Sequence, residues 1–147
     1  MRSFPMVWVV LSSLAIAGCS SGNSQTSGDP KGGDPKGASD SITVSFKKDL
    51  EPILSKTCAR PSCHGAAKSA GMQLSEGAAY ENLVKIKSTE VPRYMRVDPG
   101  IPDSSYIVMK LEGRQAVGRR MPLIGKPLSE KEIKSIRDWI ASGAKND

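Results

Sequence analysis

The chain has 147 residues, a formal net charge of +6 at neutral pH and an aromatic content of 5%. With 14 glycines and 10 prolines it must form many loops, and a protein this small buries only a modest apolar core. A mildly basic chain can bind nucleic acid, but the export signal described next argues against that partner. We therefore interpret the charge as solvated surface that steers acidic partners.

The N-terminus predicts a lipoprotein signal peptide over residues 1–18. A basic Arg2 precedes an apolar run from Met6 to Ala17, which is too short to span a bilayer comfortably. Small residues then lead to Cys19 in a pattern that resembles a bacterial lipobox, in which the cysteine carries the lipid after cleavage. The alternative is an ordinary buried cysteine. Two or more acyl chains give stable attachment, so we expect a protein anchored to the membrane by lipid.

Residues 19–40 predict the lipidated cysteine and a disordered tether. After the cysteine this segment holds no large apolar residue, and it repeats Gly-Asp-Pro-Lys-Gly at 28–32 and 33–37. Such a composition cannot bury a core. Ser20 follows the cysteine, which is typical of Gram-negative outer-membrane lipoproteins, so we expect the protein in the bacterial envelope, facing the periplasm. The remaining residues, 41–147, should form one domain.

The domain is expected to be all-α, and its first three helices are predicted from apolar spacing. Ser45 is a suitable N-cap for the first helix, and Pro52 should shorten or bend it. A second helix is expected over 76–85, and a third from about 103 to 113. The apolar face of the first helix comprises Phe46, Leu50, Ile53 and Leu54.

The last helix carries the clearest signals. Ser129 and Glu132 form a capping-box pattern, and Gly143 can supply the left-handed residue that ends the helix, which should cover about 130–142. The preceding segment, 114–127, is rich in glycine, proline and arginine and predicts a loop. The apolar face of the last helix comprises Ile133, Ile136, Trp139 and Ile140.

The residues that carry chemistry lie in one short segment. The segment contains Cys58 and Cys63. Cys63 is followed directly by His64, the single histidine of the chain. Two thiols that add across the haem vinyl groups, next to an imidazole that ligates the iron, form the C-x-x-C-H pattern of covalent haem attachment. Here four residues separate the cysteines instead of two. The extra residues should loop outward, stiffened by Pro61.

Three alternatives remain for this segment. A disulfide between Cys58 and Cys63 is reasonable in an oxidising envelope compartment. A structural zinc site prefers four nitrogen or sulfur ligands, of which this segment offers three. A reactive nucleophile would need a cysteine and His64 to converge, which neighbouring residues seldom do.

A six-coordinate haem also needs a second axial ligand, and with no other histidine a methionine is the natural candidate. Met121 precedes Pro122 on the loop before the last helix, where proline can fix a turn that aims the thioether. Met109 lies in a predicted helix and should be core, while Met72 should cover the same side of the ring as the histidine. Met95 has no supporting pattern. Met121 could instead be a surface residue.

The order of these motifs resembles class I cytochrome c domains over residues 43–145. It is most similar to the exported planctomycete and myxobacterial subgroup, in which C-x4-C-H variants occur. The motifs that carry the resemblance are Phe46 in the first helix, Cys58 to His64, Gly71-Met72-Gln73-Leu74, Pro99-Gly100 with Ser104-Ser105-Tyr106, Arg120-Met121-Pro122, and Leu128-Ser129 leading to Asp138-Trp139-Ile140-Ala141-Ser142-Gly143-Ala144.

The resemblance implies a small cytochrome c-like helical domain around one covalently bound haem c. Cys58 and Cys63 would form the thioethers, His64 would be the proximal ligand and Met121 the distal ligand. The terminal helices would pack together, with Phe46 against the last helix. The implied function is electron transfer between ferrous and ferric iron, with no catalytic role, to and from redox partner proteins of the cell envelope.

Charged loop residues offer further expectations. Arg119, Arg120 and Lys126 are candidate partners of the haem propionates or of a docking face. Two rival functions are a haem-based ligand sensor or enzyme with an open sixth site, and a haem-free lipoprotein with a disulfide that serves as an interaction module. The visible spectrum distinguishes these possibilities.

Overall fold

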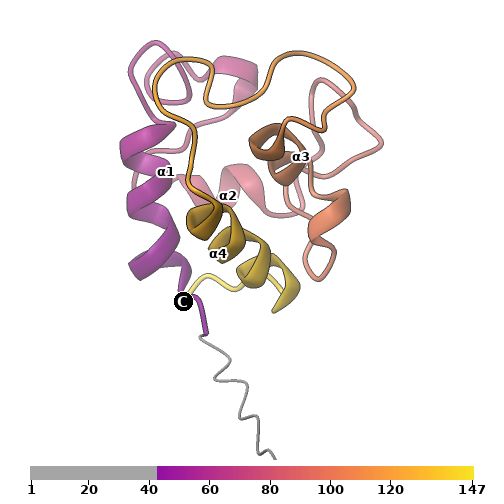
Figure 1. The fold of residues 1–147 in the computed structure, drawn as a ribbon. Helices are drawn as coiled ribbons and strands as arrows, with labels where there is room; N and C mark the ends of the chain where they lie inside the picture. Colours follow the sequence, from indigo (N-terminus) through magenta and orange to yellow (C-terminus); the bar gives the residue numbers. More distant parts are fainter. Residues whose placement is uncertain (1–42) are drawn as a thin grey trace, which may run out of the picture. The chain divides into compact units, whose positions relative to one another are not determined.

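The structure, a computed structural model, describes residues 43–147 (Figure 1). The predicted signal peptide (1–18), the lipidation site Cys19 and the tether (19–40) lie outside the described residues. Within 43–147 the regular elements are all helical, since four α-helices alternate with short 3₁₀ and π segments and two isolated β-bridges but no strand. The predicted helical class is therefore confirmed for this part of the chain.

The first helix consists of a π-helical turn, η1 (Phe46–Leu50), and helix α1 (Glu51–Thr57). Ser45 is the N-cap, as predicted, and its hydroxyl accepts the Lys48 N–H at 3.3 Å. The N–H of Glu51 bonds to the Phe46 carbonyl, five residues back. This wide turn immediately precedes Pro52, which has no N–H to donate, so the disturbance predicted at the proline takes the form of a π turn.

Helix α2 (Ala79–Leu83) is shorter than the predicted 76–85, so both predicted ends are wrong. Gly77 has a φ of +75°, which lies outside the helical region. At the other end Val84 is extended and forms a parallel bridge with Val97, a residue distant in sequence. A tertiary contact therefore ends this helix before its apolar pattern does.

The predicted third helix is divided in two. A 3₁₀ turn, η3 (Pro102–Ser104), precedes helix α3 (Tyr106–Glu112), and Ser105 between them is extended. The Ser105 hydroxyl donates to the Ile101 carbonyl at 3.0 Å and accepts the Asp98 N–H at 2.9 Å, which holds the break in place. The predicted end is confirmed, because Gly113 has a φ of +78°.

Helix α4 (Glu130–Ala141) has the predicted capping box. The Ser129 hydroxyl accepts the Glu132 N–H at 3.3 Å, and the Glu132 carboxylate accepts the Ser129 N–H at 2.7 Å. Gly143, with a φ of +100°, donates to the Ile140 carbonyl at 3.0 Å and ends the helix as predicted. The segment before α4 is a loop, also as predicted.

The core forms where α4 meets the first helix, beside which the C-terminus lies (Figure 1). The rings of Phe46 and Trp139, both buried, have centroids 5.1 Å apart, and Tyr80 stands edge-on to Phe46 at 5.4 Å. Asp147 adds a hydrogen bond beside this contact, because its side-chain carboxylate accepts the Phe46 N–H at 2.9 Å. The packing of Phe46 on the last helix, implied by the resemblance, is therefore present.

We predict that Ser129→Ala lowers the free energy of unfolding by about 1 kcal/mol, because it leaves the Glu132 N–H in the first turn of α4 without its acceptor. Ser135→Ala is the matched control. The hydroxyl of Ser135 bonds within α4 to the Lys131 carbonyl, and alanine is a better helix former than serine. Urea unfolding measures both variants, and equal losses of stability would show that the cap has no special role.

The same cap should be sensitive to acid. Hydrogen bonds from the Ser129 side chain and backbone hold the pKa of Glu132 below its ordinary value of 4.5. A lowered folded-state pKa adds stability that is complete above the unfolded value and disappears as the pH falls through the folded value. The difference in the free energy of unfolding between wild type and Ser129→Ala should therefore narrow below about pH 4.5. A difference that stays constant as the pH falls would contradict this role of the Glu132 carboxylate.

Candidate functional site

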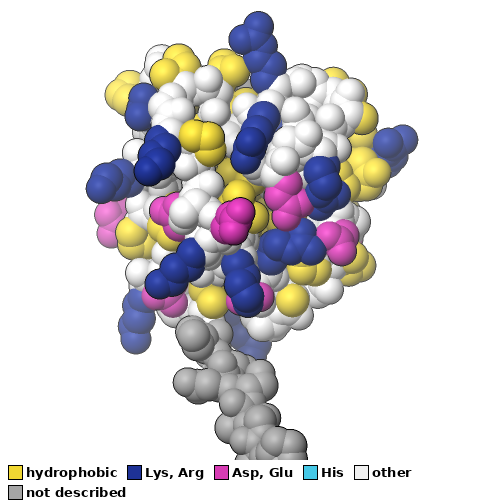
Figure 2. Space-filling view, in the orientation of Figure 1, with side chains coloured by type: hydrophobic (Ala, Val, Ile, Leu, Met, Phe, Trp, Pro, Cys, Tyr) yellow, Lys and Arg dark blue, Asp and Glu magenta, His cyan; other side chains and the backbone are white. Residues whose placement is uncertain are grey.

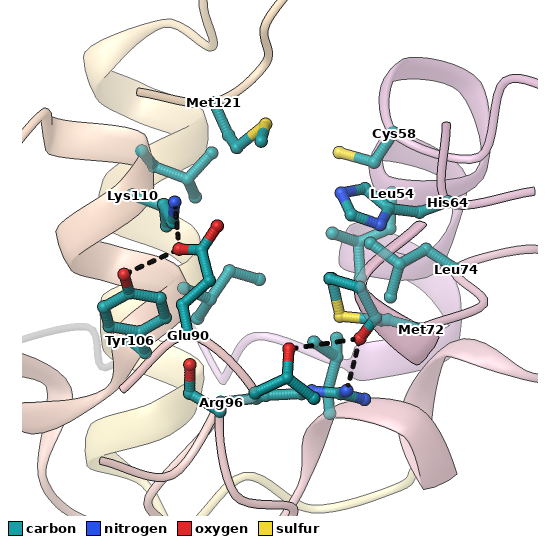
Figure 3. A pocket seen from close by; sticks show the side chains of 16 residues that line it. Leu54, Cys58, His64, Met72, Leu74, Glu90, Arg96, Tyr106, Lys110 and Met121 are labelled. Carbon is teal, nitrogen blue, oxygen red and sulfur yellow. Dashed lines mark hydrogen bonds and ion pairs between the residues drawn. The ribbon is translucent and has the colours of Figure 1, made fainter. Parts of the chain in front are cut away.

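A pocket lies between the loop that follows α1 and the loop that precedes α4 (Figure 3). Including its mouth, which opens to solvent, the pocket contains about 680 Å³ of empty space. Most of its lining side chains are apolar. They include Leu54, Met72, Leu74, Leu83, Ile107 and Leu111.

One wall of the pocket carries Cys58 and His64 (Figure 3). Cys58 is the C-cap of α1, and the chain then turns back so that the His64 N–H donates to the Cys58 carbonyl at 3.2 Å. A second bond, from the Cys63 N–H to the Arg60 carbonyl at 2.9 Å, closes the inserted residues into a bulge. The bulge points outward, as predicted. Its exposed residues are Arg60, Pro61 and Ser62.

This turn requires a glycine directly after the histidine. Gly65 is buried, and a Cβ atom there would lie 2.8 Å from the Arg60 carbonyl oxygen and closer still to that of Ala59. Both neighbours are backbone atoms of the segment that joins Cys58 to His64, so they cannot move aside without opening the turn. This role of Gly65 was not predicted from the sequence, although its place next to His64 was a usable signal.

The protonation of His64 follows from its partner. Its Nδ1 lies 2.9 Å from the Ser69 carbonyl oxygen, at the start of the 3₁₀ turn η2 (Ser69–Gly71). A carbonyl oxygen can only accept, so Nδ1 carries the hydrogen and donates it. The lone pair of Nε2 is then free to bind a metal, and the ring orientation is fixed by the backbone, as in most histidine metal ligands.

Met121 lies on the opposite wall, and its side chain points into the space that separates it from Cys58 and His64 (Figure 3). The Met121 N–H donates to the Lys110 carbonyl of α3 at 2.9 Å, which places this loop residue against a helix. The other methionines differ. Met109 is buried in α3, as predicted, and Met72 lines the pocket on the His64 side, also as predicted.

The two thiols are placed unequally. Cys58 lines the pocket, whereas Cys63 does not, and both are free in the structure. Burial, with a smaller contribution from nearby Cys63, raises the pKa of the Cys58 thiol to about 11. A thiol that stays protonated at neutral pH is a poor nucleophile, which disfavours the reactive-cysteine alternative. Within residues 43–147, no group of three or more His, Cys, Asp or Glu side chains is placed to hold a metal ion.

The arginine in the pocket lining is Arg96, which was not expected from the sequence. It is 8% exposed, and its guanidinium donates to the carbonyls of Asn82 at 2.8 Å and Ala70 at 2.9 Å. Burial lowers its pKa from the ordinary value. Arg96 directly precedes Val97, which forms the bridge with Val84. The burial of Arg96 therefore depends on a tertiary contact.

The cations expected to pair with the propionates or to form a docking face do not line the pocket. Of the described residues that line the pocket, none is Arg119, Arg120 or Lys126. Arg120 instead covers the end of α3, where its Nε donates to the Leu111 carbonyl at 2.9 Å. Its side chain passes over Gly113, at 3.2 Å from the position that a Cβ atom would occupy. Arg119, Arg120 and Lys126 therefore lie outside the pocket lining, and their role toward the propionates or a docking face stays a prediction.

Three further polar residues of the lining form a cluster on the Met121 wall (Figure 3). Lys110 pairs with Glu90, and the Tyr106 hydroxyl donates to the Glu90 carboxylate at 2.8 Å. Burial raises the pKa of Tyr106 to about 12, and Glu90 adds to the effect. The sequence held one signal for this cluster, because Lys110 follows Ile107 by three residues on the apolar face of the predicted helix.

Comparison of the chain with protein-family models, with curated proteins and with solved structures found no match.

We predict that Gly65→Ala lowers the free energy of unfolding by about 2–3 kcal/mol, the upper part of the range for a side chain forced into filled space, because the atoms it meets belong to the backbone. Gly77→Ala serves as the control, because that site has positive φ but no atom within 4 Å of the added Cβ. It should lose only about 1 kcal/mol from backbone strain. Thermal unfolding measures both, and a Gly65→Ala variant as stable as Gly77→Ala would mean that the turn can open freely.

Proposed function

We propose that this chain is an envelope-anchored, monohaem c-type cytochrome with a class I-like domain, which carries electrons between redox proteins. The observation that supports this most directly is the placement of His64 and Met121 on opposite walls of one largely apolar pocket, with Cys58 beside the histidine. A nitrogen ligand and a thioether ligand that face each other across such a pocket match the donor set of an electron-transfer haem.

Of the residues that would hold that group, Cys58, His64 and Met121 line the pocket and fit it, whereas Cys63 lies outside the lining, directly before His64 in the chain. Cys58 and Cys63 would hold it by thioethers, His64 through Nε2 and Met121 through its sulfur. When bound, the haem supplies one-electron chemistry between ferrous and ferric iron. The chain supplies the fixed ligand orientation, through the bond from His64 to the Ser69 carbonyl, and the apolar surroundings that exclude water. A thioether ligand favours the reduced state and raises the potential.

Arg96 is the chain's candidate for a propionate partner. It lines the pocket, and its guanidinium donates to three neutral carbonyls, those of Ala70, Gly71 and Asn82. A buried guanidinium with neutral partners retains its full positive charge, and its planar fork suits a carboxylate. This charge would favour a carboxylate at the base of the pocket.

The charge of the loops around the pocket favours a redox partner with an acidic surface. Segments 59–75 and 113–129, which carry the two walls, hold six basic residues and no acidic one. The two segments meet where the Arg60 guanidinium lies 3.1 Å from the position that a Cβ atom on Gly125 would occupy. On the face shown in Figure 2, basic and acidic side chains are interspersed in the lower half of the view, whereas the upper half shows basic side chains without acidic ones. A local excess of one sign steers partners of the opposite sign and weakens with added salt.

We predict that Met121→Ala opens the haem iron. The variant should bind carbon monoxide or cyanide readily, lose the weak long-wavelength band of methionine-ligated ferric haem, and show a lower reduction potential, because the thioether has gone. Absorption spectroscopy with added ligand, combined with a redox titration, measures all three.

The other methionines provide matched controls. Met72→Leu, Met95→Leu and Met109→Leu should keep the band, since leucine approximately conserves the volume of methionine. If Met95→Leu removes the band and Met121→Ala does not, the ligand assignment is wrong while the haem proposal survives. A wild-type protein that lacks the band and binds carbon monoxide readily would instead favour the sensor or enzyme function with an open sixth site.

We also propose attachment to the membrane by lipid at Cys19, from the lipobox-like pattern of the sequence. Among the residues that the structure describes, no helix is long and apolar enough to cross a membrane. Cys19→Ser should abolish lipidation and move the protein out of the membrane fraction, with an unchanged haem spectrum. Membrane association that persists in this variant, with no lipid on the wild-type protein, would contradict the proposal.

A further inference from the structure

We propose that Lys110, together with Glu90, is a positioning residue that fastens the loop bearing Met121 to helix α3 and so keeps the methionine sulfur at the pocket. This inference rests on the proposed function, because it assigns a role toward the distal ligand. It concerns a cluster that faces the pocket from the Met121 wall (Figure 3).

The hydrogen-bonding capacity of Lys110 is fully used on this loop and on Glu90. An ammonium group has three N–H donors and no acceptor. The Lys110 Nζ has three oxygen partners, namely the Glu90 carboxylate and the carbonyls of Val117 at 3.3 Å and Arg119 at 3.2 Å. Two of the three belong to the chain just before Met121. The side chain is only 10% exposed, so water competes weakly for these bonds.

The loop is shaped to fit around the ion pair. Gly118, between the two acceptor carbonyls, has a φ of +73°. A Cβ atom at this position would lie 2.7 Å from the Lys110 Nζ and 2.8 Å from a Glu90 carboxylate oxygen. An added Cβ atom would therefore force either the loop or the ends of these two side chains to shift.

Further bonds join the same loop to α3 on both sides of Lys110. The Tyr106 hydroxyl, one turn earlier, lies 3.1 Å from the Val117 carbonyl, and the Arg120 Nε donates to the Leu111 carbonyl at 2.9 Å. The Met121 N–H then reaches the Lys110 carbonyl. Residues 117–121 are thus held along α3 by a series of hydrogen bonds, with Lys110 at its centre.

Glu90 links this loop to a third part of the chain. It comes from the segment between α2 and α3, where Ser88 is buried and accepts the Val91 N–H at 3.2 Å. Burial would raise the pKa of Glu90, but hydrogen bonds from Lys110 and Tyr106 and the charge of Lys110 lower it. Loss of the lysine would leave the Glu90 carboxylate without its counter-charge, with the Tyr106 hydroxyl as the donor that remains, and would remove the Lys110 donor from the carbonyls of Val117 and Arg119.

The test uses the haem-loaded protein and Lys110→Met, which keeps a side chain of similar length without charge. Imidazole added to the ferric protein competes with Met121 for the iron, so its apparent affinity reports how easily the loop opens. We expect Lys110→Met to bind imidazole at least about tenfold more tightly than wild type and to weaken the long-wavelength band, with one covalent haem retained. The control Lys131→Met, at an exposed position of α4, should change neither readout.

Gly118→Ala provides a second, independent variant that keeps both charges. It should also raise imidazole affinity, because the added methyl group displaces the loop from the ion pair, whereas Gly100→Ala, with positive φ and no atom near the added Cβ, should not. Unchanged imidazole affinity in both Lys110→Met and Gly118→Ala would overturn the positioning role. A wild-type protein without a covalent haem or without the band would contradict the proposed function itself, so the two failures are distinguishable.

Discussion

The contact between Phe46 and Trp139 is the interaction on which the geometry of the pocket depends. It joins the first helix to α4, and Asp147 reinforces it by accepting the Phe46 N–H. The wall with Cys58 and His64 follows the first helix directly, and the wall with Met121 directly precedes α4. This aromatic contact therefore joins the two helices that flank the walls of the pocket. Such contacts between large aromatic rings dominate the stability of small cores.

The walls themselves are irregular, so their positions depend on individual hydrogen bonds. On one side, Gly65 permits a close turn of backbone and the Ser69 carbonyl orients the histidine ring. On the other, Lys110 holds two carbonyls of the loop before Met121. Within the part of the chain that the structure describes, no buried side-chain nitrogen or oxygen lacks a hydrogen-bond partner. Loops satisfied in this way can hold ligands as rigidly as helices do.

Signals that act over a few residues were readable from the sequence. The capping box of Ser129 and Glu132 and the N-cap Ser45 depend on neighbours three residues away, and both are present. The outward bulge between the cysteines likewise follows from their spacing. The ends of α2 were not readable, because Val84 leaves the helix to pair with Val97, thirteen positions further along the chain.

The arginines show more clearly that burial which depends on tertiary contacts cannot be predicted from the sequence. Arg96, Arg119 and Arg120 have identical side chains, and nothing local distinguishes the one that becomes buried. Tertiary contacts determine which arginine is buried. The bridge between Val84 and Val97 places the segment of Arg96 inside the fold, whereas Arg120 donates to the Leu111 carbonyl at the end of α3. Lys110 offered a weak signal on the apolar face of its helix, but its three acceptors come from segments that only tertiary structure brings together.

Covalent attachment of haem at Cys58 and Cys63 underlies the proposed function, and the intact mass of wild-type protein produced with cytochrome maturation factors decides it. We expect a mass equal to that of the mature polypeptide plus one haem, unchanged after extraction with acid and acetone, because thioether bonds resist that treatment. A protein that carries no haem in haem-replete cells, and in which Cys58 and Cys63 are joined to each other by a disulfide, would refute the haem proposal.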